Sequence, residues 1–168
     1  MSPKLRTVLG AIAIIVPLDQ LTKWWVASSI PRYGWIEVIE GFFRITHARN
    51  TGAAFGFGQG LPIWVFVALT VVALWMILRF YQQIDAQDRL SALALGLVVA
   101  GALGNLIDRV WHHEVIDFLQ FNFQIFIFPD FNVADSAIVI GVGLLLLDVV
   151  TQEAEESGAG AEEPEEPV

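Results

Sequence analysis

Four long apolar stretches limit what this sequence can fold into. They cover roughly residues 7–26, 61–80, 90–110 and 133–150. Each is close to the ~20 residues that an α-helix needs to cross the hydrocarbon core of a bilayer. Polar surface is also scarce, because 55% of the 168 residues are hydrophobic and only 16% are charged, which does not suit a soluble domain. We therefore predict an all-α membrane protein with four transmembrane helices.

Composition also bears on domain organisation and on partners. We expect residues 1–150 to form one membrane-embedded domain and residues 151–168 to form an acidic, disordered tail in the cytosol, because the tail has little apolar surface to bury. Much of the net charge of −9 lies in this tail, and the nine Lys and Arg are scattered along the chain. We therefore expect no binding to nucleic acid. The absence of cysteine excludes disulfides, thiolate metal sites and cysteine nucleophiles.

The segments between the apolar stretches differ in length and pattern. Residues 81–89 are short and polar, which predicts a tight hairpin between the second and third helices. Residues 24–60 and 111–132 are longer and alternate polar and apolar side chains in places, as in residues 35–40 and 115–128. We predict that these first and third loops form a small β-rich region. The Lys and Arg residues divide almost equally between the two sides, so their distribution does not decide the orientation in the membrane.

Polar residues within the apolar stretches gather at one membrane face. When the spans alternate in direction, the ends of the first and third helices meet the starts of the second and fourth. The polar residues at this face are Asp19, Gln20, Lys23, Asn105, Asp108, Arg109, Asn132 and Asp135. Ionisable groups at membrane depth are costly unless they are paired or hydrated. We interpret the cluster as a water-accessible functional site.

Helical spacing gives each of these residues a first interpretation. Asp19 and Lys23 are four residues apart, acid before base, so they can simply neutralise each other. Asn105 and Arg109 have the same spacing and point toward one spot, where they would suit the orientation of a substrate or a carboxylate. Asp108 lies about 100° around the helix from Arg109. We expect Asp108 to make an interfacial cap or a contact with water.

Two aspartates are the strongest candidates for chemistry. Asp117 lies in an otherwise apolar loop, and Asp135 begins the fourth helix, where a carboxylate also complements the helix dipole. Both would be delivered to the same face. Two carboxylates a few Å apart cannot both ionise cheaply, so they would share a proton, with one acting as base and the other as acid.

Other classes of function use similar residues. Intramembrane Asp, Lys, Arg and Asn can line an ion or proton path, but the far halves of the second and fourth helices carry almost no polar groups. A zinc site could involve His112, His113, Glu114 and Asp117, although adjacent histidines do not easily face one ion. A purely structural scaffold would not need so many polar residues on one face.

Five short segments carry a further signal. In chain order they are DQLTK at 19–23, NTGAAF at 50–55, GALGNLIDR at 101–109, VIDF at 115–118 and FNVADS at 131–136. Together they resemble the signature blocks of lipoprotein signal peptidase, also called signal peptidase II, a family of bacterial membrane aspartyl proteases. Phe128, which precedes Pro129, departs from the family pattern, in which a Trp is expected. The acidic tail lies outside the resemblance.

The resemblance implies an activity and a location. It implies an aspartic endopeptidase that removes signal peptides from diacylglyceryl-modified prolipoproteins, cutting before the lipid-modified cysteine through water activated by an aspartate dyad. The active site and the β-rich region would lie at the outer face of the bacterial cytoplasmic (inner) membrane, with both termini in the cytosol. The partners would be the prolipoprotein substrates and membrane lipids. We expect a monomer that uses no metal and no cofactor.

The resemblance also assigns residues. The catalytic pair would be Asp117 and Asp135. The residues that bind substrate or order the site would be Asn50, Gly52, Asn105, Arg109, Asn132, Ala134, Asp19 and Lys23.

Overall fold

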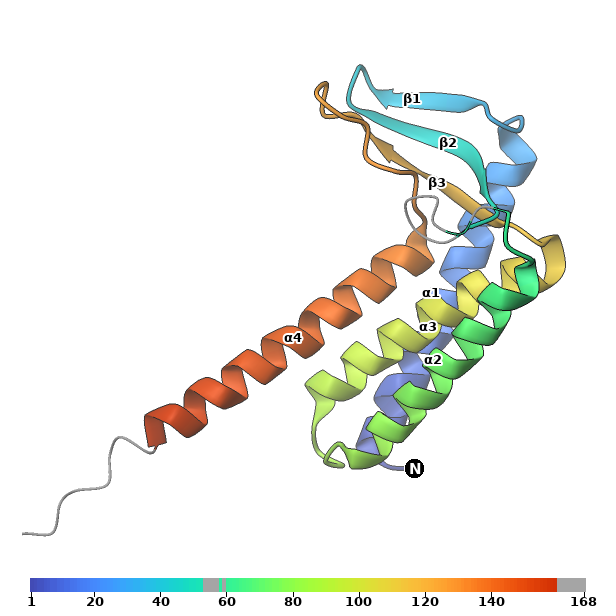
Figure 1. Cartoon of the computed structure of the whole chain (residues 1–168). Helices are drawn as coiled ribbons and strands as arrows, with labels where there is room; N and C mark the ends of the chain where they lie inside the picture. Colours follow the sequence, from blue (N-terminus) through green and yellow to red (C-terminus); the bar gives the residue numbers. More distant parts are fainter. Residues whose placement is uncertain (53–57, 59, 160–168) are drawn as a thin grey trace, which may run out of the picture.

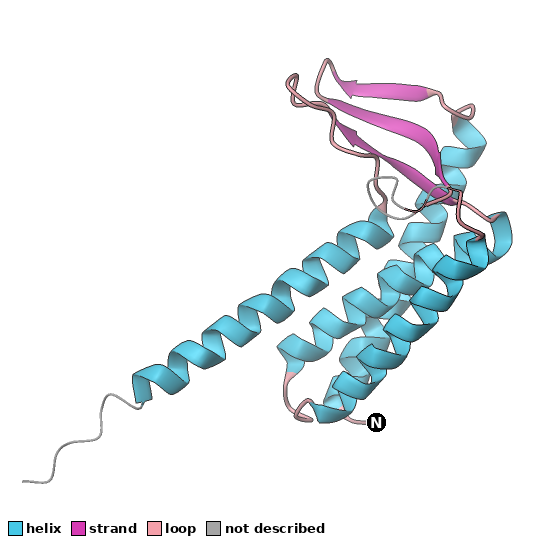
Figure 2. Cartoon of the chain, viewed as in Figure 1, coloured by secondary structure: helices cyan, strands magenta, loops and turns pink. Residues whose placement is uncertain are grey.

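A computed structural model gives the fold and describes residues 1–52, 58 and 60–159, with side chains described as far as residue 151. The elements are, in chain order, α1 (Pro3–Ser29), β1 (Trp35–Ile39), β2 (Phe43–Asn50), α2 (Ile63–Gln83), α3 (Arg89–His112), β3 (Val115–Phe121) and α4 (Val133–Ala159). All four helices are long and apolar enough to cross a membrane, which confirms the predicted four spans. The strands form one sheet at one end of the helices (Figures 1 and 2).

Local sequence explains where the helices begin and end. The Ser2 hydroxyl accepts a hydrogen bond from the backbone N–H of Leu5 at the start of α1, and the Asp88 carboxylate caps α3 in the same way. α3 ends at His113, whose backbone is left-handed with φ of 60°. Only residues 84–88 separate α2 from α3, so the predicted tight hairpin is confirmed.

α3 is the central helix of the bundle and the most buried of the four. Its small residues allow other helices to approach closely. A Cβ on Gly96 would meet the Ala11 side chain of α1 at 2.9 Å, and a Cβ on Gly101 would collide with the backbone carbonyl of Ala134 in α4. A Cβ on Gly104 would lie 2.6 Å from the Asp19 carboxylate. The small residues at 96, 101 and 104 therefore have a packing role, as is typical of membrane helices.

The sheet joins the ends of the helices to one another. It is antiparallel, in the order β1-β2-β3, with a register shift between Ile45 and Ala48 of β2. One face packs on the end of α1, where Phe118 forms a buried cluster with Val26 and Ile30. The sheet therefore fixes the positions of the first and third loops relative to the ends of the helices.

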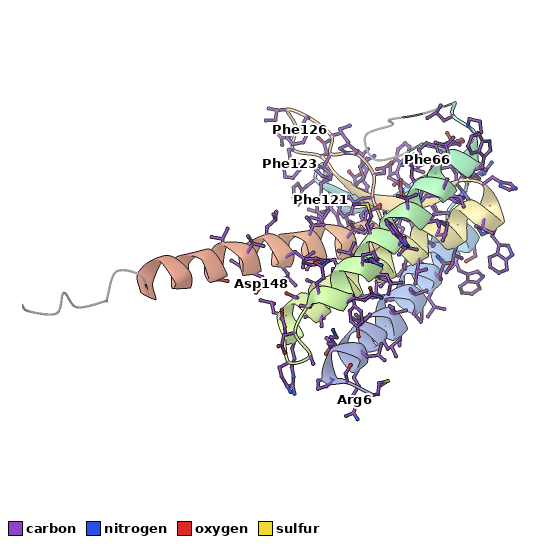
Figure 3. All side chains as sticks on the ribbon, turned by 60° about the horizontal axis from the view of Figure 1, so that its bottom comes forward. Arg6, Phe66, Phe121, Phe123, Phe126 and Asp148 are labelled. Carbon is purple, nitrogen blue, oxygen red and sulfur yellow. The ribbon has the colours of Figure 1, made fainter. Side chains whose placement is uncertain are left out.

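Aromatic rings border the outer end of β3. The rings of Phe121 and Phe123 stack with centroids 6.4 Å apart, and those of Phe123 and Phe126 with centroids 5.1 Å apart. Figure 3 shows these three side chains grouped together. Such rings favour the headgroup region of a bilayer, so this edge suits a position near the membrane surface.

The C-terminal boundary differs from the prediction. α4 continues as a helix to Ala159, past the expected end of the span at residue 150, so residues 151–159 are helical rather than disordered. Extending an existing helix adds one hydrogen bond per residue without a new nucleation cost, and Ala and Glu are good helix formers. The remainder of the expected tail, residues 160–168, lies outside the described residues.

The contact between Gly101 and α4 gives a test of the packing. Gly101→Ala should destabilise the protein by about 1–3 kcal/mol, because the new methyl group forces two backbones apart. Thermal unfolding in detergent measures this effect. The control is Gly143→Ala, where a Cβ meets nothing within 4 Å, and which should be neutral or slightly stabilising. Equal destabilisation by both substitutions would contradict the packing role.

Candidate active site

A pocket of about 550 Å³ opens where the sheet meets the ends of α3 and α4. Its polar wall includes the side chains of Asp117, Asp135, Asn50, Asn105 and Arg109. Its apolar wall comes from α4 and from the loop before it, and includes Phe128, Phe131, Ile138, Val139 and Ile140. The structure thus brings the two aspartates into one cavity with an apolar side.

Asp117 lies in β3, opposite Ala48 of β2. Its carboxylate accepts hydrogen bonds from the Asn50 amide at 3.0 Å and from the Asn132 amide at 2.7 Å. Burial, and after it the negative charge of Asp135, raise the pKa of Asp117 to about 7, although the two amides oppose the rise. Near neutral pH this carboxyl therefore exchanges a proton readily.

Asp135 lies in the first turn of α4. One carboxylate oxygen accepts a hydrogen bond from the Asn105 amide at 2.7 Å, and the other accepts the backbone N–H of Asn132 at 3.2 Å. In return, the Asn132 side-chain oxygen accepts the backbone N–H of Asp135 at 2.9 Å. This reciprocal pair is a capping box, so Asp135 completes the helix terminus and faces the pocket as well.

Asn132 links the two aspartates. Its side chain is fully buried. Its amide nitrogen donates to Asp117, while its oxygen caps the helix that carries Asp135. The same nitrogen lies 3.2 Å from the Asn105 side-chain oxygen. Asn132 therefore fixes the position of one carboxylate relative to the other.

A buried cluster of charged side chains contacts the residues that hold the two aspartates. The Lys23 ammonium lies 2.8 Å from the Asp19 carboxylate and 3.0 Å from the Asp108 carboxylate, and it donates to the Asn105 oxygen at 3.1 Å. The other oxygen of Asp19 accepts the backbone N–H of Ala134 at 2.9 Å. The predicted pairing of Asp19 with Lys23 is confirmed. Neither residue lines the pocket, but Lys23 holds Asn105, which does, and Asp19 holds the first turn of α4.

The expectation for Asp108 is wrong. Its side chain is buried rather than at a wet interface, and it accepts hydrogen bonds from the backbone N–H of Ile116 at 3.2 Å and from the Gln20 amide at 3.0 Å. It thus joins α3 to the start of β3 and to α1. Its spacing from Asn105 was the available signal, because residues three apart share a helix face.

Arg109 and Gly52 meet at the rim of the pocket. The Arg109 guanidinium donates to the backbone carbonyl of Gly52 at 3.1 Å and lies 5.5 Å from the centre of the Phe66 ring. The Gly52 N–H in turn donates to the Asn50 side-chain oxygen at 2.9 Å. Within the described part of the chain, Arg109 thus orders the loop after β2 rather than binding a carboxylate directly. Residues 53–55 of the NTGAAF segment lie outside the described residues.

The sequence did not reveal the apolar wall of the pocket. Val139 and Ile140 are as apolar as any lipid-facing residue of a spanning helix, so their composition carries no mark of a site. Asp130 and Ser136 also line the pocket and were not singled out. The position of Asp130 in an apolar loop was the signal that could have identified it.

The residues considered for a zinc site do not converge. Glu114 forms ion pairs with Arg32 and with Arg49. In the portion of the chain that the structure describes, no three His, Asp or Glu side chains are grouped so that they could hold a metal ion. His112, His113, Glu114 and Asp117 therefore do not form a metal centre.

The fold and the relatives of the chain define its class. Four spanning helices make it a multi-pass membrane protein, and its family makes it a peptidase of the aspartic type. The chain belongs to the signal peptidase (SPase) II family, whose model matches residues 11–151.

Individual relatives and solved structures agree with this assignment. The chain is 44% identical to a lipoprotein signal peptidase from Symbiobacterium thermophilum, over 89% of this chain and 96% of the relative. It is 41% identical to a lipoprotein signal peptidase from Nitratidesulfovibrio vulgaris, over 94% of this chain and 98% of that one. A bacterial membrane enzyme structure obtained by the in meso method at 2.3 Å superposes with a TM-score of 0.81 at 35% identity, covering 96% and 94% of the two chains.

Removal of the buried Lys23 ammonium should destabilise the folded protein. Lys23→Met leaves Asp19 and Asp108 buried without their cation, which should cost about 3–5 kcal/mol. The control is Arg6→Met, since Arg6 is exposed and lies at the free end of α1 (Figure 3). Thermal unfolding of both variants in detergent tests this, and a Lys23→Met protein as stable as the control would contradict it.

The raised pKa of Asp117 should make stability depend on pH. The unfolded carboxyl ionises near its ordinary pKa of 3.8, and the folded one near 7. Stability from this group is therefore complete below pH 4 and is lost as the pH rises to 7, at about 1.4 kcal/mol per unit. Asp117→Asn should remove this loss, whereas Asp85→Asn, at an exposed loop position, should retain it. Unfolding midpoints at pH 5 and pH 8 measure the difference, and identical pH dependence in both variants would refute the assignment.

Proposed function

We propose that this protein removes signal peptides from diacylglyceryl-modified prolipoproteins by cutting the peptide bond just before the lipid-modified cysteine. The observation that carries the proposal is that Asp117 of β3 and Asp135 of α4 line the same pocket. Their neighbours within hydrogen-bond distance are amides of Asn50, Asn105 and Asn132. The relatives named lipoprotein signal peptidase support the same class of substrate.

The aspartate pair provides the chemistry. Near neutral pH the two carboxyls share one proton, since Asp117 has its pKa near 7 beside the charge of Asp135. The ionised carboxyl removes a proton from a water molecule as the water oxygen attacks the scissile carbonyl. The protonated carboxyl donates a hydrogen bond to the developing oxyanion. Collapse of this tetrahedral intermediate breaks the C–N bond, and a proton passes to the leaving amine, which is the new N-terminus of the cysteine.

The two walls of the pocket suit the two parts of such a substrate. Asn50 and Asn105 offer amides to peptide groups beside the dyad. Val139 and Ile140 are exposed on α4 and continue into its lipid-facing surface. Diacyl chains lying against them gain about 0.8 kcal/mol for each methylene group buried. This burial would make the enzyme selective for substrates with a lipid-modified cysteine.

The proposed activity implies one orientation of the protein in the membrane. The site and the sheet lie at the outer face of the cytoplasmic membrane, where the mature lipoprotein emerges. An even number of spans leaves both termini in the cytosol, and α1 starts at the end of the bundle away from the sheet (Figure 1). One chain supplies both aspartates, so a monomer is sufficient for catalysis, and the chemistry proceeds without metal or cofactor.

Substitution of either aspartate tests this proposal. Asp117→Asn and Asp135→Asn should each lower cleavage of a diacylglyceryl-modified prolipoprotein by at least about 10²- to 10⁴-fold, because neither amide can exchange the required proton. The assay uses purified protein in detergent with a chelator, and thermal unfolding verifies the fold of each variant. Asp85→Asn is the matched control and should retain full activity. Retained cleavage by either site variant removes that residue from the dyad.

A further inference from the structure

A second cavity, of about 320 Å³, lies against the sheet, and we name it the sheet pocket. All three strands and the loop before α4 contribute to it, through Trp35, Arg44, Thr46, Gln120 and Asp130. Side chains alternate along β2, so that Ile45 packs toward the buried cluster on α1 while Arg44 and Thr46 line the sheet pocket. This cavity thus lies on the polar side of the sheet.

Two buried polar atoms in the sheet pocket lack a partner. The Arg44 Nε and the Thr46 hydroxyl are buried, and among the described residues neither has a hydrogen-bond partner at normal distance and geometry. The outer end of the Arg44 guanidinium is occupied, since it lies 3.4 Å from the Glu37 carboxylate and stacks over the Trp35 ring. Buried polar groups are normally satisfied, and leaving them unpaired costs free energy. Each atom would therefore gain a hydrogen bond from a ligand in the sheet pocket.

Asp130 connects the sheet pocket to the aspartate pocket, because it lines both cavities. One of its oxygens accepts a hydrogen bond from the Gln120 amide at 2.8 Å. Burial raises the pKa of Asp130, while Gln120 and the nearby Thr46 hydroxyl oppose the rise. A chain that leaves the catalytic aspartates past Asp130 would enter the sheet pocket.

We infer that the sheet pocket is a subsite for the extended polypeptide that follows the lipid-modified cysteine, an inference that rests on the proposed function. A peptide backbone offers carbonyls to the Arg44 Nε–H and the Thr46 hydroxyl, and an N–H to the Asp130 carboxylate. A phosphate would suit Arg44 but would be repelled by Asp130. The apolar signal peptide suits the lipid-facing side of the aspartate pocket, so the polar mature segment occupies the sheet.

The test compares two lipid-modified substrates with the same signal peptide. The long one continues through several residues of the mature protein, and the short one ends at the lipid-modified cysteine as its amide. Thr46→Val should lower the ratio of kcat/KM on the long substrate to that on the short one by about three- to ten-fold, the effect of one hydrogen bond. Thr46→Ser, which keeps the hydroxyl, should restore the ratio.

Controls separate binding from folding. Thermal unfolding of Thr46→Val and Thr46→Ser in detergent verifies the fold of both variants, since the Thr46 hydroxyl lies near Asp130 and lowers the pKa of that carboxyl. Glu37→Gln alters the exposed partner of Arg44 outside the sheet pocket and should leave the ratio unchanged.

Several outcomes would overturn the inference. An unchanged ratio in Thr46→Val, or an equal loss on both substrates, would show that the pocket does not bind the mature segment. An equal loss that appears only with anionic phospholipid in the micelles would assign the pocket to a lipid headgroup. Failure of the unmodified protein to cut either substrate would instead refute the proposed function.

Discussion

The Lys23 ammonium is the buried charge on which the arrangement of the site depends. It pairs with Asp19 of its own helix and with Asp108 of α3, and it donates to Asn105. Asn105 in turn holds Asp135, and Asp19 holds the first turn of α4 through the N–H of Ala134. A charge in hydrocarbon is tolerated only with such partners. Through these contacts, one side chain of α1 helps to set the relative positions of α3, α4 and the Asp135 carboxylate.

Asp117 has hydrogen-bond partners of a different kind from those of the buried aspartates Asp19 and Asp108. One cation, the Lys23 ammonium, stabilises both Asp19 and Asp108, whereas amides from Asn50 and Asn132 bind Asp117. A hydrogen-bonded cation would favour the ionised form strongly, but neutral amides oppose the effect of burial only in part. The pKa of Asp117 therefore stays near 7, at a cost in stability above neutral pH. Asp117 keeps an exchangeable proton near neutral pH because its hydrogen-bond donors are neutral amides rather than cations.

Prediction from the sequence succeeded for features that the bilayer imposes. It failed for contacts that form only when the chain folds. Apolar length identified four spans, and the cost of intramembrane charge identified the face that holds the site. Asp108 was misplaced because its partners Lys23 and Gln20 lie in α1, far from it in the sequence. Val139 and Ile140 were missed because a pocket wall and a lipid-facing surface have the same composition. The helical extension of α4 to Ala159 was missed because composition alone does not show that a neighbouring helix is already nucleated.

By itself, the sequence determined the number of spans and the end of the helices at which the candidate site lies, since hydrophobic length and the cost of buried charge act locally along the chain. The signature segments were identified by resemblance to a family. Only the tertiary structure decided that Asn132 links Asp117 to the helix of Asp135, that Lys23 lies beneath both, and that Asp130 joins two cavities. Such contacts depend on the angle between packed helices and on the register of the strands. Both are set by the packing of side chains that are far apart in the chain.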